Sequence, residues 1–219
     1  MREPIKRVWA RENDFIEKED AFRGSWAMLE RIGTRVRSSH VLQKETQNAF
    51  HVGSKICETR KWEWPWAMME MDANEEGVIV TPRRVLDIGC GFRPFTIWLR
   101  DQGHSVMGVD DMSWSTKEDV GMLLGQYGCG FVETDARRLP FPPQSFDYAF
   151  CISVLEHEEP AAVASIIREG CRVSRKLFIV TVDSGPSVQH LLPEEPEPED
   201  VIRTGGGNPV AGLVFKGGF

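Results

Sequence analysis

The hydrophobic pattern of the chain changes near residue 83. In the first part, apolar side chains recur at intervals of three, four and seven residues, the spacing of one stripe on a helix: Phe15, Phe22, Trp26, Leu29 and Ile32. We therefore expect two or three helices before residue 60. Residues 60–70, RKWEWPWAMME, then place three tryptophans around Pro65. Proline disfavours helix at the preceding Trp64 but can open a new helix after it.

From Arg83 onward, short β-rich runs alternate with segments of helix length. Five such runs lie between residues 83 and 183: RVLDIG, SVMGVD, GFVETD, FDYAFCIS and KLFIVTVD. Strands that alternate with helices form right-handed βαβ units, so the pattern predicts an α/β fold. Its sheet should be mostly parallel, with helices on both faces. VAGLVFK near the end of the sequence suits one last strand.

The change of pattern predicts two parts in the chain. Residues 1–82 are expected to form an N-terminal helical cap or lid, and residues 83–219 an α/β domain. Within the second part, PEEPEPED at residues 193–200 carries five acids and no base. A run of this composition favours an irregular, solvated loop.

The turn after the first predicted strand has the chemistry of a ligand-binding loop. VLDIGCGFRPF places Gly89 and Gly91 where a strand turns into a helix. Glycine lets the backbone approach a ligand closely, and the free N–H groups of the helix start point at it. A nicotinamide or flavin fingerprint would have a third glycine where Pro94 stands, so a dinucleotide site is disfavoured. A tight turn without a ligand remains the alternative.

Acidic residues follow the next two predicted strands. Asp110 lies twenty-one residues after Gly89 at the end of SVMGVD, a spacing typical of an acid that accepts hydrogen bonds from ribose hydroxyls. Its alternative role is to cap the helix that follows. Asp135 suits an exocyclic amine and the Ala136 N–H a ring nitrogen, as in adenine. Because parallel strands end at one edge of the sheet, these loops should converge.

Together, LDIGCG, GVD and DARRLPFPPQSFDYAFCISVLEHEEP resemble the S-adenosylmethionine-dependent methyltransferases with a Rossmann-like fold, most closely the branch that methylates quinone precursors and other small molecules. The resemblance covers residues 83 to about 183. It implies S-adenosylmethionine as cofactor and S-adenosylhomocysteine as product. It also implies the residues that bind them: Asp87, Gly89, Cys90, Gly91, Arg93, Asp110, Asp111, Asp135, Ala136, Cys151, Ile152 and Ser153.

The resemblance implies a distinct role for most of these residues. The glycine loop, with Asp87 beneath it, would hold the methionine part, Asp110 the ribose, and Asp135 with Ala136 the adenine. The backbone from Cys151 to Ser153 would pass beside the methionine part.

The sequence also departs from the family. Arg93 stands where the family usually has glycine, and it either pairs with the methionine carboxylate or faces solvent. The usual Lys-Pro-Gly-Gly turn before the fifth strand is absent, and the final strand pair is shortened.

Candidate residues for the methyl acceptor are fewer. His157 could act as a general base, or it packs within a helix that opens near Leu155. The neighbouring Glu156 and Glu158 are expected to be solvated or near a helix N-terminus. Trp62 and Trp66 could form a substrate wall, or they pack the cap on the sheet. Arg60 is a further candidate for contact with cofactor or substrate, and no metal-ligand motif is present.

Charge and composition narrow the partners. The net charge of −7 falls to −2 without the acidic run, and no basic stripe follows the sequence, so a nucleic-acid partner is not expected. No apolar run approaches the roughly 18 residues of a membrane span, and no signal peptide is visible. The five scattered cysteines form no CxxC pair and suit a reducing cytoplasm.

These observations predict an enzyme that transfers a methyl group to O, N or C of a small molecule. The alternatives are a methyltransferase acting on a protein or glycan-linked acceptor, and a non-catalytic protein that binds S-adenosylmethionine as a scaffold.

Overall fold

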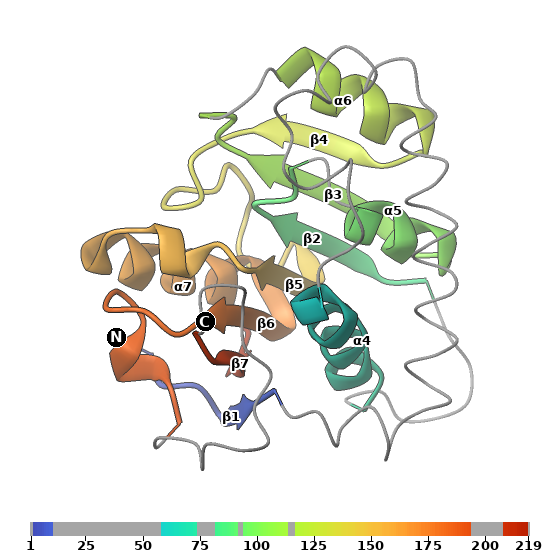
Figure 1. The fold of residues 1–219 in the computed structure, drawn as a ribbon. Helices are drawn as coiled ribbons and strands as arrows, with labels where there is room; N and C mark the ends of the chain where they lie inside the picture. The colour runs from blue at the N-terminus through green and yellow to red at the C-terminus, as the bar shows by residue number, and fades with distance from the viewer. Residues whose placement is uncertain are drawn as a thin grey trace.

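A seven-stranded β-sheet forms the centre of the computed structural model (Figure 1), which describes residues 2–10, 58–73, 82–91, 94–113, 117–193 and 208–218. The strand order is β1-β7-β6-β5-β2-β3-β4. The five predicted strands are present and mutually parallel: β2 (Arg84–Ile88), β3 (Ser105–Asp110), β4 (Gly130–Glu133), β5 (Phe146–Ile152) and β6 (Ser174–Asp183). The predicted α/β class with a mostly parallel sheet is confirmed.

The strand order reverses direction at β2. From β2 the chain adds β3 and then β4 on one side, whereas β5 and β6 lie on the other side of β2. The carboxyl ends of β2 and β5 are therefore neighbours at the point where the order switches. In open α/β sheets, ligands bind in the crevice at this point.

An antiparallel pair completes the sheet beyond β6. The predicted last strand is β7 (Val210–Lys216), which pairs antiparallel with β6. Its other neighbour is β1 (Lys6–Trp9), an edge strand near the N-terminus that the sequence pattern did not predict. The strand pair expected to be shortened is thus completed by the start of the chain. β1 is short and carries Lys6 and Arg7, which is typical of a protected sheet edge.

The helices cover both faces of this sheet (Figure 1). One hydrophobic cluster unites residues of α4 (Glu58–Ala73), α5 (Pro94–Asp101) and α6 (Lys117–Gln126) with one face. A second cluster unites the other face with α7 (Pro160–Val173) and the short 3-10 helices η1 (Leu155–His157) and η2 (Gln189–Leu191). Helices on both faces were predicted from the βαβ pattern, and this prediction is confirmed.

The side chains of β5 show how the strands serve both clusters. Tyr148, Phe150 and Ile152 belong to the cluster with α4 and α5, and Ala149 and Cys151 belong to the cluster with α7. Successive side chains of a strand point to opposite faces, so a strand covered on both sides is apolar along most of its length. All seven residues of β5 are buried, as this argument requires.

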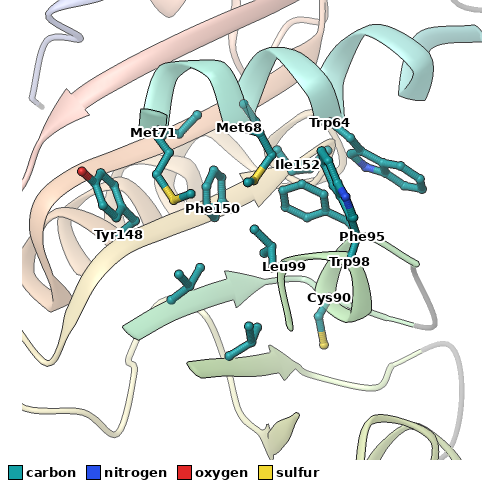
Figure 2. Close-up of a cluster of buried hydrophobic side chains, with 14 of the residues drawn as sticks. Trp64, Met68, Met71, Cys90, Phe95, Trp98, Leu99, Tyr148, Phe150 and Ile152 are labelled. Carbon is teal, nitrogen blue, oxygen red and sulfur yellow. The ribbon is translucent and has the colours of Figure 1, made fainter. Parts of the chain in front are cut away.

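Helix α4 continues through Pro65, whereas the sequence pattern predicted an interruption before it. Proline removes one backbone hydrogen bond from a helix. Burial of large side chains offsets this loss: Figure 2 shows Trp64, Met68 and Met71 of α4 lying over the sheet and α5. The Trp64 ring stacks on Phe95 with centroids 5.9 Å apart.

The predicted cap is described only in part. Residues 11–57 and 74–81, which include the other predicted helices, lie outside the described residues. In the described part, β1 joins the sheet and α4 packs against β5, β6 and β7. The boundary between cap and cofactor domain at residue 82 therefore stays a prediction.

Candidate active site

The glycine loop after β2 forms a cradle at the switch point. Gly89 and Gly91 have φ angles of 70° and 45°, a backbone region that favours glycine. The N–H groups of Gly89 and Cys90 donate to the carbonyl of Val109 at 2.8 and 3.1 Å. A Cβ added to Gly89 would lie 2.4 Å from Cγ2 of Val154. The loop after β5 thus contacts the loop after β2, and only glycine fits between them.

Cys90 turns its side chain away from this cradle. A Cβ added to Gly108 of β3 would lie 2.7 Å from its Sγ, so the thiol packs in the core against β3. A ligand in the crevice can therefore meet Cys90 only through its backbone. Arg93, the other side chain predicted in this loop, lies outside the described residues.

Asp110 holds the glycine loop from the end of β3. Its carboxylate accepts hydrogen bonds from the N–H of Gly91 and the N–H of Met112, both at 3.0 Å. Asp110 is 8% exposed, whereas the adjacent Asp111 is exposed and accepts from the Ser113 N–H. The structure thus directs Asp110, and not Asp111, at the glycine loop, and the contact of Asp110 with the ribose stays a prediction.

Asp87 supports the loop from below. Its carboxylate is buried in β2 and accepts a hydrogen bond of 2.5 Å from the hydroxyl of Thr96. Thr96 belongs to the first turn of α5, so this bond fixes the start of the helix next to the cradle. Asp87 thus lies in the strand that leads into the loop, and the contact with the methionine part that the resemblance implies stays a prediction.

Asp135 and Ala136 lie in the loop after β4. Asp135 accepts from the backbone N–H and the guanidinium of Arg137, both at 2.8 Å, and these hydrogen bonds lower the pKa of its carboxyl. At Glu158, burial and, secondarily, the charge of Asp111 raise the pKa of the carboxyl, while the charge of Arg137 lowers it. The predicted adenine contact is therefore exposed and already paired with Arg137.

Ser153 ends β5 and connects the cradle to α4. Its φ angle is 47°, and its N–H donates to the carbonyl of Thr181 at 2.8 Å. Cys151 and Ile152 before it are buried in the two faces of the sheet. The Ser153 hydroxyl donates to Oε1 of Glu63 at 2.5 Å. Ser153, which was predicted to lie beside the cofactor, is thus hydrogen-bonded to α4 of the predicted cap.

Glu63 is the centre of a buried polar network that the sequence did not reveal. It is 0% exposed, and its Oε1 also accepts from the hydroxyl of Thr181 at 2.7 Å. Arg60 donates to Oε2 of Glu63 and to the Ser153 hydroxyl. Arg60 was predicted to contact cofactor or substrate, and the structure places it at this edge of the sheet. The network fastens α4 to the ends of β5 and β6.

Two further carboxyl groups face this network. At Asp183, burial and, secondarily, Glu63 raise the pKa to about 6, against the opposing effect of Arg60. At Glu156, burial raises the pKa to about 8 against the opposing effect of its own backbone N–H, with added effects of Glu63 and Asp183. Both carboxylate oxygens of Glu156 are buried, and no other described residue donates a hydrogen bond to them.

The buried oxygens of Glu156 correct the expectation that it would be solvated, whereas its place in the first turn of η1 agrees with the alternative, a position near a helix N-terminus. Its neighbour His157, the predicted base, is exposed in η1, and its N–H donates to the Val154 carbonyl at 3.0 Å. The helix expected near Leu155 is only this short 3-10 helix, and α7 begins at Pro160. The catalytic role of His157 stays a prediction.

Trp62 and Trp66 pack beside this network but are buried in the core. Their rings stack with centroids 5.0 Å apart and planes at 10°. A Cβ added to Gly212 of β7 would lie 2.4 Å from the Trp66 ring, so this ring lies flat on the strand. These contacts favour packing as the role of Trp66, and a contact with substrate stays a prediction for both.

Comparisons with known proteins agree with this geometry. Residues 86–177 match the family model described as "Methyltransferase domain", which confirms the resemblance to the Rossmann-like S-adenosylmethionine-dependent methyltransferases. The matched residues contain the glycine loop, Asp110, Asp135 and Ser153. The predicted cofactor, S-adenosylmethionine, is the one that this family uses.

Two curated relatives are similar to about half of the chain. An 18S rRNA (guanine-N(7))-methyltransferase of Bos taurus is 33% identical over 132 residues, which are 56% of this chain and 44% of the relative. A ubiquinone biosynthesis O-methyltransferase of Idiomarina loihiensis is 30% identical over 108 residues, 46% of this chain and 43% of the relative. The chain spans less than half the length of these two relatives.

Solved structures share the fold. A 1,6-didemethyltoxoflavin-N1-methyltransferase of Burkholderia thailandensis, solved with 1,6-didemethyltoxoflavin and S-adenosylhomocysteine bound, superposes with a TM-score of 0.54 at 19% identity. The match covers 82% of this chain and 88% of that protein. It extends beyond the residues of the family match and supports the observed arrangement of the sheet.

Neither a metal site nor a membrane span is evident in the described part of the chain. The described residues contain no group of three or more His, Cys, Asp or Glu side chains able to hold a metal ion. None of the described helices has the length and apolar character needed to pass through a bilayer.

Proposed function

We propose that the protein is an S-adenosylmethionine-dependent methyltransferase that acts on a small molecule. The observation that carries this proposal is the cradle formed by Gly89, Gly91 and Asp110 at the switch point of the sheet, within the residues that match the methyltransferase family. The cradle fits the cofactor, because its glycines admit a close backbone approach and a buried carboxylate faces it.

The residues of the cradle divide the binding of the cofactor. Asp110 accepts from the ribose hydroxyls, and the Gly89–Gly91 backbone with Asp87 holds the methionine part. The loop of Asp135 and Ala136 binds the adenine. For this contact, the Arg137 guanidinium must either share the Asp135 carboxylate with the adenine or give up its hydrogen bond to it. When bound, S-adenosylmethionine supplies an electrophilic methyl group on its sulfonium.

In the transfer, the residues of the chain mainly position the reacting groups. Methyl transfer is an in-line displacement, and alignment of the reacting groups supplies roughly 7 to 11 kcal/mol of barrier reduction. Val154 covers the glycine loop, and α4 brings Glu63 and Arg60 to Ser153 at the same edge. These elements close the edge of the sheet beside the cradle, where they exclude water from the reacting groups.

The choice of a small-molecule acceptor rests on charge. The chain carries 33 acids against 26 bases, and the side chains beside Ser153 are mostly carboxylates. RNA is the second candidate, because one curated relative is an rRNA methyltransferase. A polyanion would meet this acidic edge with repulsion, so we rank it lower. No particular feature of the described residues favours a protein or glycan-linked acceptor, or a non-catalytic scaffold role.

We also place the protein in the cytoplasm. Cys129 and Cys171 are buried free thiols in the described part of the chain, which suits a reducing compartment.

Thermal unfolding with added ligands tests the proposed function. S-adenosylmethionine or S-adenosylhomocysteine at about 100 times its dissociation constant should add roughly 2.7 kcal/mol of stability. NAD serves as the control, because it shares the adenosine but requires a different loop. A rise in melting temperature with NAD and none with either sulfur ligand would contradict the proposal.

A further inference from the structure

The carboxylates of Glu63, Glu156 and Asp183, together with Arg60, form a cluster at the ends of β5 and β6, which we call the acid cluster. The cluster adjoins the cradle directly. Ser153 bonds to Glu63, and the next residue, Val154, packs on Gly89. Glu156 follows in η1, and Asp183 ends β6. Whatever binds at the acid cluster therefore lies beside the methionine part of the cofactor.

The hydrogen bonds of the acid cluster are unevenly distributed. Glu63 receives hydrogen bonds from Ser153, Thr181 and Arg60 and is thereby well satisfied. The oxygens of Glu156 are buried and receive none from the other described residues. A buried polar group that lacks a partner costs about 1 to 3 kcal/mol, and more when it is charged. Such a cost at this edge of the sheet points to a ligand that supplies the missing donors.

The charges show which donors fit. When ionised, the three carboxylates face the single guanidinium of Arg60, so the cluster lacks positive charge. The sulfonium of the cofactor carries charge but no hydrogen. A protonated amine supplies both a positive charge and several N–H donors, the combination that a buried carboxylate binds most strongly.

We propose that the acid cluster binds the acceptor and selects an amine, held through its N–H groups by Glu156 and Asp183. This inference rests on the proposed function and narrows its acceptor from O, N or C to nitrogen. Neutral hydroxyl compounds bring donors without charge, and anionic acceptors are repelled.

The same residues can account for the proton of the reaction. In the free protein at neutral pH, Glu156 is mostly protonated because its pKa is raised to about 8, and it releases this proton to water when the ammonium binds. The bound ammonium then transfers one proton to the Glu156 carboxylate, which leaves a nitrogen lone pair. That pair forms the bond to the methyl carbon while the bond from carbon to sulfur breaks, and its electrons stay on sulfur. The products are the methylated ammonium and neutral S-adenosylhomocysteine, and Glu156 is left protonated, as in the free protein. Charge and atoms balance without a further reactant.

Titration calorimetry on the full chain, saturated with S-adenosylhomocysteine, tests this inference. Benzylammonium, benzyl alcohol and benzoate share one ring and differ in the charge of their polar group. Benzylammonium should bind at least about tenfold more tightly than the alcohol, the effect of one charge-assisted hydrogen bond. Benzoate should bind least. Equal or tighter binding of the alcohol or of benzoate, or failure of benzylammonium to bind, would overturn the proposal.

Glu156→Gln and Glu159→Gln form a matched pair of variants. Glu159 is exposed at the start of α7, so its variant should retain the preference for benzylammonium. Glu156→Gln should abolish that preference while S-adenosylhomocysteine binds as before. Asp183→Asn is a second variant, which should reduce the preference for benzylammonium less than Glu156→Gln does. If Glu156→Gln does not fold, Asp183→Asn alone tests whether the acid cluster binds the amine. An unchanged preference in both Glu156→Gln and Asp183→Asn would overturn the proposal.

Two further outcomes separate the inference from the proposed function. If Glu156→Gln weakens binding of S-adenosylmethionine but not of S-adenosylhomocysteine, Glu156 serves the sulfonium, and the amine proposal is wrong. If the wild-type protein binds neither, the proposed function fails. In that case the acid cluster is tested by titrating benzylammonium and benzyl alcohol into the protein without cofactor. The wild type should bind benzylammonium more tightly than the alcohol, and Glu156→Gln should lose this preference.

Discussion

Two carboxylate-bearing regions meet at one edge of the sheet, and they differ in how their hydrogen bonds are satisfied. At the cradle, Asp110 and Asp87 are buried and accept hydrogen bonds from the protein itself. At the acid cluster, Glu63 is satisfied in the same way, but Glu156 is buried without a described donor. Satisfied carboxylates fix the backbone before a ligand arrives, whereas an unsatisfied one stores a cost that a ligand can remove.

The largest expected effect concerns α4, which brings the two regions together. Trp66→Ala should lower the free energy of unfolding by about 3 to 5 kcal/mol, because the ring is buried against Gly212 and Trp62. Chemical denaturation measures this loss. Met122→Ala, at an exposed position of α6, should change stability by less than about 0.5 kcal/mol.

The Trp66 variant also tests its predicted contact with substrate. If Trp66→Ala stays folded with nearly wild-type stability and loses only methyl transfer, the ring belongs to an acceptor site and the packing role is wrong.

The cradle is tested next. Asp110→Ala should weaken binding of S-adenosylhomocysteine by about 1.5 to 3 kcal/mol, some 10- to 100-fold, because it removes an acceptor for the ribose and loosens Gly91. Asp111→Ala, whose carboxylate is exposed, should have a much smaller effect. Calorimetry on both variants compares them, and greater sensitivity at Asp111 would show that the ribose is assigned to the wrong carboxylate.

The buried Glu156 carboxyl of the acid cluster should make the free energy of unfolding depend on pH. The pKa of Glu156 is raised from its ordinary value of 4.5 to about 8 by burial and by Glu63 and Asp183, with its own backbone N–H and Arg60 opposing. The folded state therefore binds this proton more tightly, and the stability that it contributes is fully present below pH 4.5. That stability is lost as the pH rises through about 8.

Glu156→Gln removes this dependence. Relative to the wild type, the variant should gain at least about 1.4 kcal/mol between pH 5 and pH 9, the equivalent of one pKa unit. Denaturation at both pH values measures the difference between the two proteins. The same pH slope in wild type and variant would show that Glu156 is solvated, as the sequence suggested.

The fold and the cradle could be predicted because their signals are local. Five strands were evident from short β-rich runs, and Asp110 from its place at the end of a strand after a glycine turn. β1 was missed because a strand of four residues, two of them charged, is too short to show an alternation of apolar and polar positions. The continuation of α4 through Pro65 was missed because tertiary burial outweighs the local cost of proline.

The acid cluster could not be predicted because its contacts join distant segments. Glu63 bonds to Ser153 and Thr181, which are 90 and 118 residues away in the sequence. Glu156 stands in an acidic segment whose sequence predicts exposure to solvent, whereas in the fold η1 contacts β6 and the Glu156 carboxylate is buried. The single available signal was its position just after β5, at the edge where ligands bind.

A crystal structure of the full chain with S-adenosylhomocysteine tests the relation between the two regions most directly. The ribose hydroxyls should bind the Asp110 carboxylate, and the sulfur should face the acid cluster, with open space between it and Glu156. A ligand whose ribose contacts Asp111 or another group, or whose own amino group occupies the carboxylate of Glu156, would contradict the division into a cofactor cradle and an acceptor site.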